Sequence, residues 1–142
     1  MEIRSLTEDY AVSPQIEPGD VPALVAAGFT TIIDNRPDGE IPGALHTEPM
    51  RRAVEAAGLV FVANPVIGGA ISDGNVLAQR AAIAGSRGPV LAYCASGNRS
   101  SIVWAMAEAG MQPTGSLIDT AARWGYNLEP YRDRIEGFAA TR

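Results

Sequence analysis

Short apolar segments alternate with segments of helical periodicity along this chain. Four runs rich in β-branched and apolar residues, each ended by polar or turn-forming residues, predict buried strands over residues 10–12, 30–34, 59–62 and 89–93. Capping residues and apolar residues at helical spacing predict helices over residues 20–28, 47–57, 72–84, 100–109, 117–124 and 130–138. Strands that alternate with helices form parallel βαβ units, so the pattern predicts an α/β fold with helices on both faces of the sheet.

The same pattern predicts one domain over residues 1–142. No linker, low-complexity tract or internal repeat interrupts it, and domains commonly contain about 100–150 residues. In parallel α/β folds, ligands bind beyond the carboxyl ends of the strands. We therefore look for function in the loops at 36–42, 65–71 and 94–99.

Composition narrows the classes of function. The chain has 16 acidic and 11 basic residues, a formal charge of -5, and no lysine, so every basic residue is arginine. An acidic chain without a basic cluster is a poor candidate for binding nucleic acid or an anionic membrane, and the absence of lysine excludes Schiff-base chemistry. The single cysteine, Cys94, excludes an internal disulfide and a Cys-rich zinc site.

Targeting signals are not evident. Residues 1–6 include one acidic side chain, Glu2, and no apolar core, unlike a secretory signal, and no apolar run approaches the about 20 residues of a membrane span. We therefore expect a cytoplasmic protein without a membrane partner. The lone His46 is expected at the surface, and it has no second ligand at a spacing that would hold a metal. The sequence leaves the oligomeric state open.

The segment after the strand at 89–93 carries the candidate chemistry. Cys94 lies at the strand's carboxyl end, and Arg99 lies where a helix begins. A short loop between strand and helix turns backbone N–H groups inward as an anion cradle, Arg99 can bind an oxyanion with two hydrogen bonds, and this positive field favours the thiolate form of Cys94. The cradle residues would be Ala95, Ser96, Gly97 and Asn98.

Two interpretations of Cys94 compete. A cysteine at the end of a buried strand is ordinarily a packing residue. A packed cysteine, however, does not need a polar loop of small residues that ends in arginine. We therefore favour a nucleophilic thiolate, with Ser100 as a hydrogen-bond donor that eases departure of the sulfur in a second step.

Residues 94–100 resemble the active-site loop of two related enzyme classes. One is the cysteine-dependent phosphatases of the tyrosine and dual-specificity type, and the other is the rhodaneses, which carry sulfur as a cysteine persulfide. Over roughly residues 3–137 the chain resembles a bacterial family, the phosphatase-like domain of the beta-lactamase-hydrolase-like proteins, through residues 6–7, 12–16, 35–40, 92–94 and 125–128. The resemblance implies a phosphatase-like fold, with a central, mainly parallel sheet of four or five strands flanked by helices.

Two departures from the phosphatase pattern resemble rhodanese instead. Four residues separate Cys94 from Arg99, where these phosphatases have five, and Tyr93 replaces the usual histidine before the nucleophile. The residues at 33–36 and 41–44 also look like rhodanese, whereas the tail after Gly110 does not.

The identity of a general acid is a separate question. A phosphatase needs a group that protonates the leaving oxygen, typically an aspartate on a neighbouring loop, and residues 65–71 contain none. Asp73 is better interpreted as a helix cap. Asp38 is the candidate acid, with turn formation as the competing interpretation, and Arg36 is either a second anion contact or the partner of a carboxylate.

Three functions follow from these residues. The leading hypothesis is a cofactor-free hydrolase of phosphate monoesters that forms a phosphocysteine at Cys94. The alternative is a sulfurtransferase that carries a persulfide on Cys94, and the third is a non-catalytic anion-binding module. The expected partner is accordingly a phosphorylated or a sulfur-donating substrate.

Overall fold

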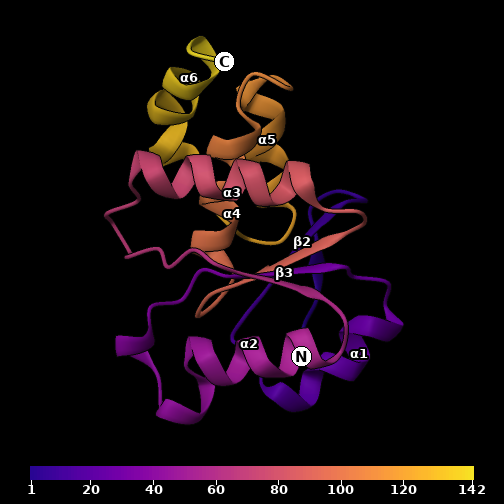
Figure 1. Ribbon diagram of the computed structural model, residues 1–142. Coiled ribbons are helices and arrows are strands. Elements are labelled where there is room, and N and C mark those ends of the chain that lie inside the picture. The colour runs from indigo at the N-terminus through magenta and orange to yellow at the C-terminus, as the bar shows by residue number, and fades with distance from the viewer.

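The computed structural model describes residues 1–142 and contains a five-stranded sheet between two layers of helices (Figure 1). The strand order is β1-β2-β5-β3-β4, in which β1 is antiparallel to β2 and the other neighbours are parallel. The strands are β1 Arg4–Ser5, β2 Tyr10–Ser13, β3 Thr31–Asp34, β4 Val60–Ala63 and β5 Val90–Tyr93. The mainly parallel α/β fold is confirmed, with β1 as a strand that the hydrophobic pattern did not reveal.

Six α-helices cover the sheet, and short 3-10 turns lie at residues 18–20, 38–40, 43–45 and 129–131. The helices are α1 Val21–Ala26, α2 Thr47–Ala56, α3 Asp73–Gly85, α4 Asn98–Glu108, α5 Thr114–Ala122 and α6 Arg132–Ala140. In Figure 1, α1 and α2 lie on one face of the sheet, and α3 to α6 lie on the other. No helix combines the length and the apolar character needed to cross a bilayer.

Alternation along the strands divides the apolar side chains between two cores. On β3, Ile32 packs toward α1 and α2, whereas Ile33 packs toward α3 to α6. The second face is the larger, and its central helix, α4, is buried along most of its length, Trp104 included. Because α4 is anchored on all sides, its first turn is fixed relative to the end of β5, which is where Cys94 lies.

A buried network of amides connects the sheet to α3. The Gln79 side chain of α3 accepts hydrogen bonds from Asn35 (3.0 Å) and Asn64 (2.8 Å), which follow β3 and β4 directly. Its own NH2 group donates to the hydroxyl of Tyr10 (3.0 Å), which in turn donates to the Ser100 carbonyl (2.8 Å). Buried polar groups destabilise a protein unless they are paired, so this network fixes the strand ends to the start of α4.

We predict that Gln79→Met, which keeps the length of the side chain, lowers the free energy of unfolding by about 2–3 kcal/mol because it removes the hydrogen bonds of Gln79 to two buried amides and a hydroxyl, which keep only their other partners. Chemical denaturation measures the change. Gln112→Met, at a half-buried position outside the network, is the matched control and should change stability by less than about 0.5 kcal/mol. Equal losses in the two variants would contradict the role given to the network.

Candidate active site

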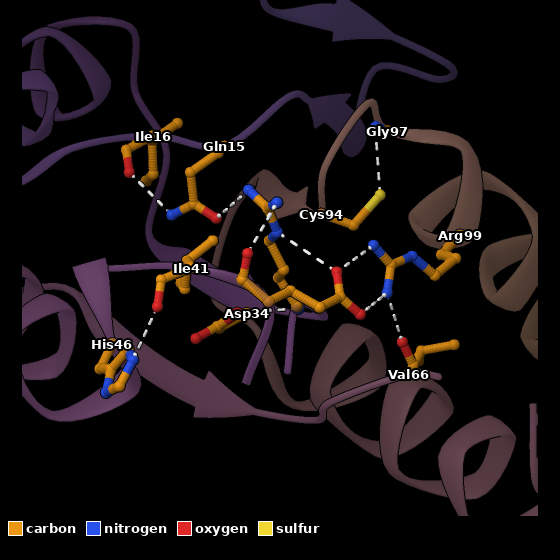
Figure 2. Close-up of polar contacts among 11 residues, drawn as sticks. Gln15, Ile16, Asp34, Ile41, His46, Val66, Cys94, Gly97 and Arg99 are labelled. Carbon is orange, nitrogen blue, oxygen red and sulfur yellow. Dashed lines mark hydrogen bonds and ion pairs between the residues drawn. The ribbon is translucent and has the colours of Figure 1, made fainter. Parts of the chain in front are cut away.

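The loop from Cys94 to Arg99 connects β5 to α4 at the carboxyl edge of the sheet. Cys94 is 1% exposed, and its sulfur accepts a hydrogen bond from the backbone N–H of Gly97 at 3.1 Å (Figure 2). Gly97 has φ +92°, a left-handed conformation that glycine adopts without strain, and α4 begins at the next residue. Ala95, Ser96 and Asn98 are exposed in the same four-residue turn, and Gly97 is the predicted cradle residue whose N–H contacts the sulfur.

Arg99, which follows this loop, has its guanidinium in contact with a carboxylate. Its two terminal nitrogens approach the two oxygens of Glu40 at 2.7 and 2.8 Å, and one of them also donates to the carbonyl of Val66 at 2.8 Å (Figure 2). Its side chain is only 14% exposed. The hydrogen bond to Glu40 is the main reason that the pKa of Arg99 lies above its usual value, and the nearby charge of Cys94 raises it further.

Glu40 joins a second arginine to this pair. Arg36 donates from Nε to the Glu40 carboxylate at 3.3 Å, and it also contacts the Gln15 side chain at 3.4 Å. Of the two roles expected for Arg36, the structure therefore shows the carboxylate partner. The hydrogen bond from Arg99, helped by the charge of Arg36, holds the pKa of Glu40 below its usual value, so this carboxyl is ionised at neutral pH.

Asp38 takes the turn role rather than a position suited to a general acid. One of its carboxylate oxygens accepts hydrogen bonds from the backbone N–H (2.8 Å) and the hydroxyl (3.0 Å) of Thr47, the first residue of α2. The same hydroxyl also donates to Asp34 at 3.2 Å. Asp34 lies at the end of β3, and burial raises the pKa of its carboxyl group. The backbone N–H of Arg36 donates a hydrogen bond to this carboxyl group, which fixes the start of the loop. The expected acid role of Asp38 is not supported by this geometry.

Ser100 also differs from expectation. Its hydroxyl is fully buried and donates to Asn35 at 2.9 Å instead of to the sulfur, whose donor is the N–H of Gly97. The reason is the amide network, which offers an acceptor on the core side of α4.

His46 is half-buried rather than at the surface, and its ring contacts the Ile41 carbonyl at 2.9 Å. Asp73 pairs with Arg134 at 3.3 Å, and the cap of α3 is Ser72.

Sequence reasoning missed the importance of Glu40. It lies two residues after Asp38 in the same loop, and only the 3-10 turn at 38–40 decides which carboxylate faces Arg99. The sequence did hold one indication of this role. The site is rich in arginine within an acidic chain, and a partly buried arginine requires a carboxylate or carbonyl partner.

A protein-family comparison gives an independent view of the chain. Residues 2–111 match the family described as beta-lactamase hydrolase-like protein, phosphatase-like domain. A beta-lactamase hydrolase-like protein of Agrobacterium fabrum is 34% identical over 130 residues, which is 90% of this chain and 30% of that relative. The chain therefore spans less than a third of the length of the curated relative that it matches.

Solved structures also resemble this chain. A candidate phosphatase from Neisseria meningitidis is 34% identical and superposes with a TM-score of 0.82 over 97% of this chain and 99% of its own. PTPMT1 in complex with PI(5)P superposes with a TM-score of 0.81 over 98% of this chain and 95% of its own at 12% identity, which shows a shared fold alone.

We predict that Glu40→Gln increases the affinity of the protein for inorganic phosphate by about fivefold at low salt, because it removes a negative charge that competes for Arg99 while Val66 still holds the guanidinium. Isothermal titration calorimetry measures the change. Glu48→Gln is the matched control, because Glu48 is exposed and pairs with Arg51 on α2. An unchanged or weaker affinity in Glu40→Gln would mean that Glu40 orients Arg99 and does not compete with the anion.

Proposed function

The chain belongs to the family of phosphatase-like domains of beta-lactamase hydrolase-like proteins, and from this premise we propose that it hydrolyses phosphate monoesters with Cys94 as the nucleophile. A phosphatase-like function follows from the family and from the similar structures. The observation that carries the finer proposal is the convergence of a sulfur, an inward N–H and an arginine on one short loop. The Gly97 N–H lies 3.1 Å from the sulfur, and Arg99 is the next charged residue.

The proposed reaction has two displacements at phosphorus. The Cys94 thiolate attacks, an S–P bond forms, and the bond from phosphorus to the ester oxygen breaks with its electron pair on the leaving alcohol. Water then attacks the phosphocysteine, the S–P bond breaks, and phosphate leaves with the thiolate restored. Arg99 and the N–H groups at the start of α4 hold the remaining phosphoryl oxygens, where negative charge concentrates. Entry of the phosphate requires Arg99 to exchange contacts with Glu40 for contacts with substrate.

Protonation of the leaving oxygen limits the substrates in this proposal. Asp38 is held by Thr47, and Glu40, the carboxyl that contacts Arg99, is kept ionised by its arginine partners. An ionised carboxylate cannot donate a proton, so the chain favours leaving groups that depart as stable anions. Aryl phosphates fit this requirement better than alkyl phosphates.

We therefore predict a steep dependence of rate on the leaving group. An alkyl phosphate should turn over about 10²–10⁴ times more slowly than an aryl phosphate, because that is the usual contribution of a general acid. Comparison of kcat/KM over a series of esters with graded leaving groups measures the slope. Equal rates for alkyl and aryl esters would contradict the proposal that no carboxyl group donates a proton.

We predict that Cys94→Ser abolishes release of phosphate from an aryl ester while the binding of inorganic phosphate persists, because the substitution keeps the loop and removes the thiolate. Colorimetric detection of phosphate measures turnover, and calorimetry measures binding. Ser116→Ala, on α5, is a control that should leave both unchanged. Phosphate release that survives in Cys94→Ser would show that this sulfur is not the nucleophile.

A second function is favoured by the four-residue spacing from Cys94 to Arg99 and by the lack of an acid. As a sulfurtransferase, Cys94 would take the outer sulfur of thiosulfate and release sulfite, and cyanide would then take that sulfur from the persulfide as thiocyanate. This chemistry does not require a protonated leaving oxygen. Thiocyanate formation without phosphate release would replace the phosphatase proposal, and phosphate binding without either turnover would support a non-catalytic anion-binding module.

A further inference from the structure

The outer side of the 94–99 loop is held by residues from both ends of the chain. Tyr126, which follows α5, donates from its hydroxyl to the carbonyl of Ser96 at 2.8 Å. Arg4, on β1, donates to the same carbonyl at 3.3 Å and to the Tyr126 hydroxyl at 2.6 Å. Tyr126 is 7% exposed, and the Arg4 guanidinium lies 5.7 Å from the centre of its ring. One loop carbonyl is thus bound by two donors, although it belongs to an exposed residue.

The position of that carbonyl determines the direction of the N–H that contacts the sulfur. The Ser96 carbonyl and the Gly97 N–H belong to one planar trans peptide, so they point in opposite directions. Tyr126 and Arg4 bind the carbonyl on the outside of the loop, and the N–H consequently faces inward, 3.1 Å from the Cys94 sulfur. Rotation of this peptide would bring a carbonyl oxygen toward the sulfur and remove the sulfur's backbone donor.

The side chain of residue 97 has to be absent for this contact to form. A Cβ placed on Gly97 would overlap the Tyr126 hydroxyl and lie 3.3 Å from Val12. The φ of +92° adds a second reason for glycine, because residues with a Cβ rarely adopt it. Tyr126 therefore packs directly on the backbone of the loop, and its hydroxyl lies close enough to set the orientation of a single peptide group.

We propose that Tyr126, supported by Arg4, is a positioning residue that orients the Ser96–Gly97 peptide so that its N–H stabilises the thiolate of Cys94. The inference deepens the proposed function, since it concerns the same sulfur, but it is a statement about the protonation of that sulfur and not about turnover. Tyr126 does not touch the sulfur and acts only through the peptide. Arg99 on α4, which is charged, and Tyr10 on β2, whose pKa is raised by burial so that it stays neutral, are the titratable groups that interact with Cys94, and neither contacts the Ser96 carbonyl.

The test is Tyr126→Phe, which removes one hydroxyl, keeps the ring packed against Gly97 and changes no charge. The chain has a single cysteine, so the ultraviolet absorbance of the thiolate, taken at each pH as the difference between each protein and the same protein carrying Cys94→Ser, reports on Cys94 alone. We expect the pH midpoint of this signal to rise by about one unit in Tyr126→Phe, which lowers the thiolate fraction about tenfold below the midpoint, because rotation of the released peptide weakens the hydrogen bond from the Gly97 N–H to the charged sulfur. Arg4→Gln should raise the midpoint less, because the Tyr126 hydroxyl still donates to Ser96.

Tyr131→Phe is the matched control, because Tyr131 is a half-buried tyrosine on the 3-10 turn that precedes α6. It should leave the midpoint unchanged, and thermal melts of both variants show whether folding is affected. A midpoint in Tyr126→Phe equal to that of the wild-type protein would overturn the proposal, even if the wild-type protein hydrolyses phosphate esters. A raised midpoint would support it even if the wild-type protein hydrolyses none, so the two proposals can fail separately.

Discussion

Four residues have to carry the chain from Cys94, just after β5, to Arg99 and still turn a backbone N–H toward the sulfur of Cys94. So short a turn needs a left-handed residue, which Gly97 supplies with φ +92°, and it needs anchors on both sides. The buried helix α4 and the amide network fix its end, while Tyr126 and Arg4 hold its outer face. The remaining features of the site, including the position of the arginine, depend on that turn.

The charge on Arg99 is balanced by protein before any substrate binds to it. Both of its terminal nitrogens contact Glu40, and Glu40 in turn contacts Arg36, so two arginines share one carboxylate at the edge of the sheet. Binding of an oxyanion is then an exchange of one anionic partner for another, and the favourable energy is the difference between the two contacts. An anion with two charges gains more from this exchange than one with a single charge, which favours a phosphate ester in its dianionic form.

The hydrophobic pattern predicted the strands, the helices and the Cys94–Arg99 loop because each of these depends on local periodicity and on turn-forming residues. β1 was missed because a strand of two residues has no period, and its pairing with β2 is tertiary. The sequence also did not reveal which hydrogen-bond partners the site residues have. The Ser100 hydroxyl binds Asn35 instead of the sulfur, and Glu40 rather than Asp38 contacts Arg99. Both outcomes depend on the 3-10 turn at 38–40 and on the amide network, which are set by packing between distant segments. The role of Tyr126 has the same origin, since it reaches the loop from the far end of the chain.

In the proposed mechanism, the Cys94 sulfur attacks phosphorus while the 94–99 loop holds the phosphoryl oxygens. Mass spectrometry of the protein, quenched with acid during turnover of an aryl phosphate, detects the intermediate itself. We expect a phosphoryl group on the peptide that contains Cys94, and none in Cys94→Ser. Release of phosphate without such an adduct, or a persulfide on Cys94 formed from thiosulfate in a protein that never releases phosphate, would contradict it.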